Sequence, residues 1–122
     1  MKVIITGGAG FIGSHLANLS LQEGARVIVI DNLVNGRMGN IESHLSHTQF
    51  QFVKEDVCHT QAIEKYFQDV DYIFHLAALA DIVPSINRPL DYHRANVEGT
   101  LSILEIARKH RIKKLEIGRA HV

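Results

Sequence analysis

The chain has 122 residues, of which 46% are apolar and 21% charged, a composition typical of one globular unit rather than of a disordered segment. Thirteen basic and thirteen acidic residues give a formal net charge of zero, so nothing in the charge balance suggests a nucleic-acid or anionic-membrane partner. The apolar runs are far shorter than the ~20 residues needed to cross a bilayer, and the sequence has no signal-peptide core. Its single cysteine cannot form an internal disulfide. Together these features favour a cytoplasmic protein.

The first elements follow a strand, turn, helix, strand order. The β-branched run over residues 3–5 predicts a strand, and after a glycine-rich turn Ile12, Leu16 and Leu19 recur at helical spacing. A glycine then ends the predicted helix. Residues 26–31 are apolar on both faces, as is typical of a central parallel strand.

The remaining elements continue this alternation. The patterns predict a loop over 32–40, a short helix over 41–45, a strand over 49–53, a helix over 61–68, a strand over 71–76, a loop over 81–89, a helix over 90–110 lined by Ala95, Leu101, Leu104 and Ala107, and a strand beginning over 113–117. Strands that alternate with helices predict an α/β fold with a doubly wound parallel sheet of the Rossmann type, truncated after the start of its fifth strand.

The glycine-rich turn has the spacing of a phosphate-binding loop. Gly7, Gly10 and Gly13 stand three apart between a predicted strand and helix, where missing side chains let a pyrophosphate approach the backbone and the helix N-terminus. Asp31 ends the next strand, where a carboxylate can accept hydrogen bonds from an adenosine ribose and repel a 2′-phosphate. The alternative is a structural glycine turn followed by a solvated aspartate.

Five ordered motifs carry a family resemblance. They lie at residues 6–14, 31–33, 56–57, 75–78 and 96–100. Together they resemble the N-terminal half of an extended short-chain dehydrogenase/reductase, in the branch of NAD-dependent nucleotide-sugar epimerases and dehydratases such as UDP-glucose 4-epimerase. The resemblance implies NAD as cofactor, a nucleotide sugar as substrate and a homodimer for the full-length protein, with no nucleic acid or membrane partner.

The resemblance also implies a set of cofactor-binding residues. Gly7, Gly10, Phe11, Ile12 and Gly13 would lie beside the pyrophosphate, Asp31, Asn32, Asn35 and Gly36 around the adenosine ribose, Asp56 and Val57 at the adenine, Leu76, Ala77 and Ala78 along the nicotinamide-side ribose, and Asn96 behind the cofactor. Several of these have structural alternatives. Asp56 can be an acidic helix cap, Ala77 and Ala78 can be ordinary packing, and Asn96 can form a structural hydrogen bond with neighbouring backbone.

Other candidate residues favour structural roles. His44 and His47 share a predicted helical face but have no third ligand nearby, so no metal site is predicted. Cys58 has no basic neighbour in the sequence and is predicted to be a structural thiol. The epimerase branch often has a basic residue after the His-Leu-Ala-Ala stretch, whereas this chain has Ala80 and Asp81, which leaves the sugar open.

The family's catalytic residues are not found in the sequence. Relatives use a Ser or Thr and a Tyr-x-x-x-Lys pair, whose tyrosine takes the proton of the sugar 4-hydroxyl while hydride moves to NAD. The three tyrosines here, Tyr66, Tyr72 and Tyr92, are followed four positions later by Val70, Leu76 and Asn96. We therefore expect the chain itself to be inactive.

The last seven residues depart from the family pattern. Residues 116–122, EIGRAHV, equal the translation of a common sequencing-adapter string, which we interpret as an untrimmed adapter behind an incomplete Rossmann domain over 1–115. The leading hypothesis is the NAD-binding part of a nucleotide-sugar epimerase or dehydratase that works through a 4-keto sugar. The alternatives are a noncatalytic dinucleotide-binding Rossmann sensor and a fragment without function, and a Tyr-x-x-x-Lys pair in the full-length sequence would exclude the sensor.

Overall fold

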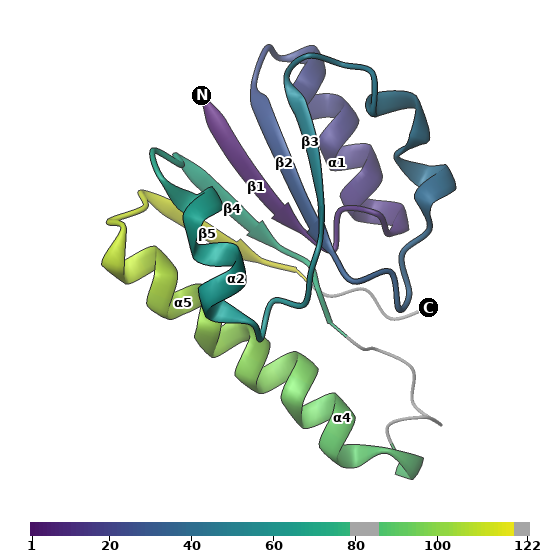
Figure 1. Cartoon of the computed structure of the whole chain (residues 1–122), viewed down its shortest axis with the longest axis vertical. Helices are drawn as coiled ribbons and strands as arrows, with labels where there is room; N and C mark the ends of the chain where they lie inside the picture. Colours follow the sequence, from purple (N-terminus) through teal and green to yellow (C-terminus); the bar gives the residue numbers. More distant parts are fainter. Residues whose placement is uncertain (79–85, 119–122) are drawn as a thin grey trace.

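A five-stranded parallel sheet forms the centre of the molecule (Figure 1). The computed structural model describes residues 1–78 and 86–118. The strands are β1 (Lys2–Thr6), β2 (Arg26–Asp31), β3 (Phe50–Lys54), β4 (Tyr72–His75) and β5 (Lys114–Ile117), in the order β3-β2-β1-β4-β5. Every pairing is parallel, which confirms the predicted doubly wound sheet. The strand predicted over 113–117 is β5, and its last residues, Glu116 and Ile117, pair with β4.

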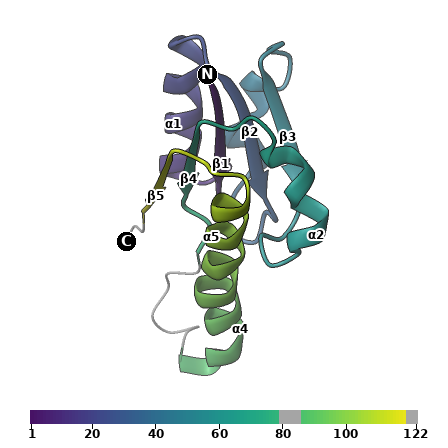
Figure 2. The same cartoon turned by 90° about the vertical axis from the view of Figure 1, so that its left-hand side faces the viewer.

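Helices cover both faces of this sheet (Figure 2). On one face α1 (Phe11–Gln22) packs against the sheet, and on the other lie α2 (Thr60–Ile63) and α5 (Gly99–Lys109). Successive side chains of a strand point to opposite faces. Accordingly, Val3 and Ile5 join the core under α1, whereas Ile4 between them joins the core under α2 and α5.

Two predicted helices are shorter and tighter than expected. The predicted helix over 41–45 is replaced by two 3-10 turns, η1 (Met38–Asn40) and η2 (Glu42–His44), around the fully buried Ile41. The helix predicted over 61–68 is α2 followed by the 3-10 turn η3 (Glu64–Phe67). Segments this short are held by one or two buried side chains and are too short to propagate an α-helix.

The long helix predicted over 90–110 is divided into three parts. α4 (Pro89–His93) leads through a π-helical turn, η4 (Arg94–Glu98), into α5. The predicted lining was wrong at two positions, because the side chains of Leu101 and Leu104 are exposed. The buried side chains are those of Ile103 and Ile106. The sequence offers apolar residues on two sides of this helix, and only the packed sheet selects one of them.

Of the three apolar residues that predicted α1, only Leu16 packs against the core, and it is partly buried. About half of the surface of Ile12 and of Leu19 is exposed. The buried residues are Gly13, Ser14, Ala17 and Leu21. Mostly small residues on this face let the helix approach the sheet and the preceding loop closely.

Part of one predicted loop falls outside the described residues. Of the loop predicted over 81–89, residues 81–85 are not described, and this includes Asp81; Ala80 lies outside as well. Among the helices of the described ranges, none combines the length and the apolar character needed to cross a bilayer.

Candidate functional site

A cavity lies where the carboxyl ends of the central strands meet. The strand order reverses between β1 and β4, and doubly wound sheets bind ligands in the crevice at such a point. The cavity measures about 320 Å³. The predicted site residues that line it are Gly7, Gly10, Asp31, Asn32, Asn35, Gly36, Asp56, Val57, Leu76, Ala77 and Ala78. Residues from four separate predicted motifs therefore meet in one cavity.

Four predicted site residues do not line this cavity. Phe11 and Ile12 are exposed at the start of α1. Gly13 is buried beneath the loop. Asn96 lies in η4 beside the cavity-lining Ala95, and its backbone carbonyl accepts a hydrogen bond from the Thr100 hydroxyl at 2.7 Å. Their proposed contacts with a cofactor remain predictions.

The three glycines of the loop occupy their positions for different structural reasons. Gly7 has a φ of +70°, and a Cβ there would lie 2.8 Å from the backbone nitrogen of Ala77. A Cβ on Gly13 would lie 2.4 Å from the carbonyl oxygen of Gly7, closer than atoms can approach. A Cβ on Gly10 would meet only that oxygen, at 3.3 Å. Packing therefore requires glycine at two positions, whereas Gly10 borders the cavity.

No side chain caps the N-terminus of α1. Gly10 is the N-cap residue and forms no side-chain cap, and the first turn contains no acidic residue. The first N–H groups of a helix have no partner within the helix and carry a partial positive charge. This end of the helix can therefore accept the oxygens of a phosphate.

Asp31 organises the loops on both sides of it. One carboxylate oxygen accepts a hydrogen bond from the Ala9 N–H at 3.0 Å and the other from the Leu33 N–H at 2.7 Å. The second bond holds Leu33 at a φ of +65°, a conformation that side chains other than glycine rarely adopt. No sequence pattern indicated this structural role. A carboxylate can accept about four hydrogen bonds, so a ribose can still bind here.

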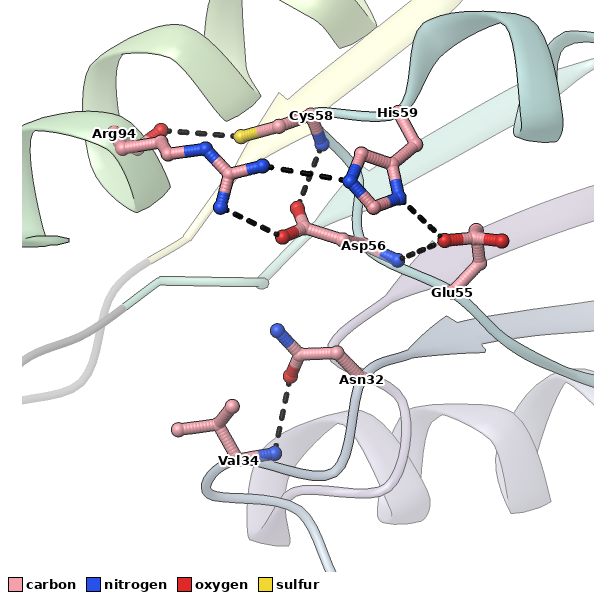
Figure 3. Close-up of polar contacts among 7 residues, drawn as sticks. All are labelled: Asn32, Val34, Glu55, Asp56, Cys58, His59 and Arg94. Carbon is pink, nitrogen blue, oxygen red and sulfur yellow. Dashed lines mark hydrogen bonds and ion pairs between the residues drawn. The ribbon is translucent and has the colours of Figure 1, made fainter.

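The far side of the cavity carries a polar cluster that joins β3 to η4 (Figure 3). The Asp56 carboxylate accepts from the Cys58 N–H at 2.8 Å and pairs with the Arg94 guanidinium at 3.3 Å. Arg94 also lies 3.5 Å from Nε2 of His59, whose Nδ1 is 2.7 Å from Glu55. Asp56 does not cap α2, because the N-cap residue is His59 and no side chain caps it. Figure 3 shows Asn32 and Val34 across from this cluster.

Two groups in the cluster have shifted pKa values. The hydrogen bond from His59 lowers the pKa of the Glu55 carboxyl. Burial, with the Asp56 carboxylate nearby, raises the pKa of the Cys58 thiol to about 11. The thiol is therefore protonated at neutral pH and donates to the carbonyl oxygen of Arg94 at 3.2 Å, in agreement with a structural role.

Several cavity-lining residues were not predicted from the sequence. They are Ile30, Val34, Glu55, Cys58, Arg88, Asp91, Arg94 and Ala95. Glu55 stands two positions after the end of a predicted strand, where doubly wound sheets bind ligands, so its place in the sequence could have indicated it. Nothing local to Arg88 or Arg94 indicates that their helical segment returns to the cavity. Within the described ranges, no three His, Cys, Asp or Glu side chains are arranged to hold a metal ion.

Comparisons with known proteins agree with this architecture. Residues 3–118 match the model of the NAD dependent epimerase/dehydratase family. The chain is 38% identical over 109 residues to UDP-glucuronic acid decarboxylase 2 of Arabidopsis thaliana, which covers 89% of the chain and 23% of that protein.

Solved structures show the same fold. UDP-N-acetylglucosamine 4-epimerase from Methanobrevibacter ruminantium, in complex with UDP-N-acetylmuramic acid, matches with a TM-score of 0.86 and 38% identity, over 93% of the chain and 36% of that structure. UDP-glucose 4-epimerase of Thermus thermophilus, in complex with NAD, matches with a TM-score of 0.82 and 33% identity, over 94% and 36%. The chain thus spans about a quarter to a third of the length of these proteins.

Proposed function

Because this chain belongs to the NAD dependent epimerase/dehydratase family, we propose that it is the NAD-binding part of a nucleotide-sugar epimerase or dehydratase. The specific activity we propose is that of a UDP-glucose or UDP-N-acetylglucosamine 4-epimerase. Relatives of both names are among the similar structures, which supports a UDP-sugar as the substrate of the full-length protein.

The observation that carries this proposal is the convergence of three different recognition groups on one cavity. The glycine loop and the start of α1 suit a pyrophosphate, Asp31 suits the hydroxyls of an adenosine ribose, and Asp56 suits the amino group of adenine. Leu76, which follows β4, borders the part of the cavity proposed for the nicotinamide half. The residues present therefore fit a dinucleotide.

The chemistry divides between the cofactor and the chain. When bound, NAD would supply a reversible hydride acceptor for C4 of the sugar. The residues described above would bind and orient the dinucleotide. The chain offers no Tyr-x-x-x-Lys pair to take the proton of the sugar hydroxyl. We propose that this chain by itself does not turn over sugar nucleotides.

An exposed apolar stripe supports a homodimer for the full-length protein. Val97, Leu101 and Leu104 stand at helical i, i+4 and i+7 positions and are 43%, 59% and 42% exposed. Such a stripe is costly in water and suits burial against a second copy. Leu101→Glu should convert a full-length dimer into a monomer in analytical ultracentrifugation, and an unchanged mass would exclude this interface.

The test of the proposed function combines binding with turnover. We expect calorimetry to show NAD binding to the chain, and we expect no epimerisation or dehydration of UDP-glucose, UDP-N-acetylglucosamine or dTDP-glucose. Extending the chain with its natural downstream sequence should restore one of these activities. Failure of the chain to bind NAD would refute the proposal, whereas NAD binding by an inactive extended protein without the Tyr-x-x-x-Lys pair would favour the sensor.

A further inference from the structure

A buried series of hydrogen bonds links β1, β4 and α5 next to the cavity. It runs from Thr6 at the end of β1, through His75 at the end of β4, to Thr100 in α5. The Thr6 hydroxyl lies 2.6 Å from Nδ1 of His75, and Nε2 of the same ring lies 3.1 Å from the Thr100 hydroxyl. Thr6 is fully buried and His75 is 2% exposed.

The partners at the two ends determine where the protons lie. The Thr6 hydroxyl oxygen accepts hydrogen bonds from the N–H groups of Leu76, at 3.1 Å, and Ala77, at 3.2 Å. The Leu76 N–H is shared with the backbone carbonyl of Thr6, at 3.0 Å. A hydroxyl has two acceptor positions and one proton, so the proton of Thr6 must point to Nδ1 of His75. At the other end Thr100 donates its only proton to the carbonyl oxygen of Asn96, so it must accept from Nε2. The Thr6 end thus requires an unprotonated Nδ1 and the Thr100 end a protonated Nε2, and the two requirements agree on one neutral tautomer.

The hydrogen bonds from Thr6 through His75 to Thr100 join two walls of the cavity. Leu76 and Ala77 line the cavity, and their N–H groups are fixed by Thr6. At the far end, the Asn96 carbonyl belongs to η4, the π-helical turn that brings Arg94 and Ala95 to the cavity. The imidazole ring of His75 links these two walls, because Nδ1 accepts a hydrogen bond from Thr6 and Nε2 donates one to Thr100.

We propose that His75 is a positioning residue of the dinucleotide site, held neutral with its proton on Nε2. It does not touch the cofactor itself. It orders the Thr6 hydroxyl, which in turn holds the backbone of Leu76 and Ala77 where the nicotinamide half would pass. The tautomer follows from the hydrogen bonds alone, whereas the positioning role rests on the proposed function.

The tautomer can be measured directly on the wild-type chain. Nitrogen NMR of protein carrying ¹⁵N-labelled histidine, at pH 7.5, should show His75 with Nδ1 at the chemical shift of an unprotonated imidazole nitrogen and Nε2 at that of a protonated one. The resonance is assigned by its loss in His75→Gln. A protonated Nδ1 would overturn the inference, whether or not the chain binds NAD.

A matched pair of variants tests the positioning role. Thr6→Val removes the hydroxyl, whereas Thr6→Ser keeps it and loses only a methyl group. We expect Thr6→Val to bind NAD about tenfold more weakly, because the Ala77 N–H loses its acceptor, whereas the Leu76 N–H keeps the Thr6 backbone carbonyl. We also expect the Nδ1 signal of His75 to move away from the unprotonated position. Thr6→Ser should retain the wild-type tautomer and affinity.

The outcomes separate the two proposals. Equal NAD affinity in Thr6→Val and wild type would overturn the positioning role and leave the proposed function intact. Failure of the wild type to bind NAD would refute the proposed function, and the positioning role with it, while the tautomer measurement would still stand or fall by itself. If Thr6→Val does not fold, His75→Gln provides the same comparison, since the NMR assignment already requires it.

Discussion

The two ends of the cavity are built by different means. At the glycine-loop end, contacts are short, buried and mostly backbone: Gly13 packs against Gly7, and Asp31 accepts from two N–H groups. At the Asp56 end, the contacts join side chains in partial contact with solvent, with Arg94 51% and Asp56 23% exposed. Exposed ion pairs contribute only ~0–1 kcal/mol. Substitutions should therefore be severe at the first end and mild at the second.

The largest effect is expected for Gly13→Ala. The added Cβ would lie 2.4 Å from the Gly7 carbonyl oxygen, and backbone cannot move aside as a flexible side chain can. We expect a loss of about 3 kcal/mol of unfolding free energy, the upper range for overpacking, measured by urea denaturation. Gly39→Ala is the control, because a Cβ there meets nothing within 4 Å. Equal stability of the two variants would show that the loop is not closely packed.

Gly10→Val should affect binding rather than folding. A Cβ at this position meets only the Gly7 carbonyl oxygen, at 3.3 Å, whereas its branches would enter the space proposed for the pyrophosphate. We expect NAD affinity to fall at least a hundredfold, about 2.7 kcal/mol, with a smaller change in urea stability than in Gly13→Ala. Unchanged affinity in calorimetry would mean that the loop is a structural turn only.

Asp31→Ala should reduce both NAD affinity and the preference for NAD over NADP. The carboxylate is proposed to accept from the ribose and to repel a 2′-phosphate. We expect a loss of about 1–3 kcal/mol of NAD binding energy, measured by titration with both cofactors. Ala9 and Leu33 also lose their acceptor, so Asp31→Asn, which keeps one side-chain oxygen, separates the loop from the charge. Equal wild-type affinity for both cofactors would remove the proposed role.

Arg94→Gln tests the expectation that substitutions at the Asp56 end of the cavity have mild effects. Its ion pair with Asp56 is partly exposed, so we expect less than about 1 kcal/mol of lost stability, decreasing further as salt is added. Thermal unfolding at low and high salt measures this. A loss comparable to that of Gly13→Ala would show that the Asp56 end is as rigid as the glycine loop.

The smallest effect is expected at Cys58, where the readout is reactivity. Its pKa is raised to about 11, so the rate of alkylation by iodoacetamide should stay low through neutral pH and rise only as pH approaches that value. In the unfolded chain the rise should occur at lower pH, near the ordinary thiol value. Asp56→Asn should move the folded-state rise to lower pH, because the Asp56 carboxylate contributes to the shift.

Sequence patterns predicted the strands better than the helix faces. The run that became β2 has apolar residues at nearly every position, so no choice of face is needed. In α1 and α5, by contrast, the apolar pattern placed Ile12 and Leu101 on the face that packs against the core, whereas about half of each residue's surface is exposed. A helix with apolar residues on two sides offers two orientations of similar hydrophobicity, and close packing against the sheet decides between them.

The sequence by itself determined the α/β fold, the glycine loop and the acid that ends β2, because each depends on residues within one strand-turn-helix unit. Only the tertiary structure brought η4 and the start of α5 back over the carboxyl ends of the strands, so that Arg94 meets Asp56 and Thr100 meets His75. These pairs are separated by 25 residues or more along the chain. Contacts of this kind depend on how layers pack, which no local pattern encodes, and they decide which polar groups surround the site.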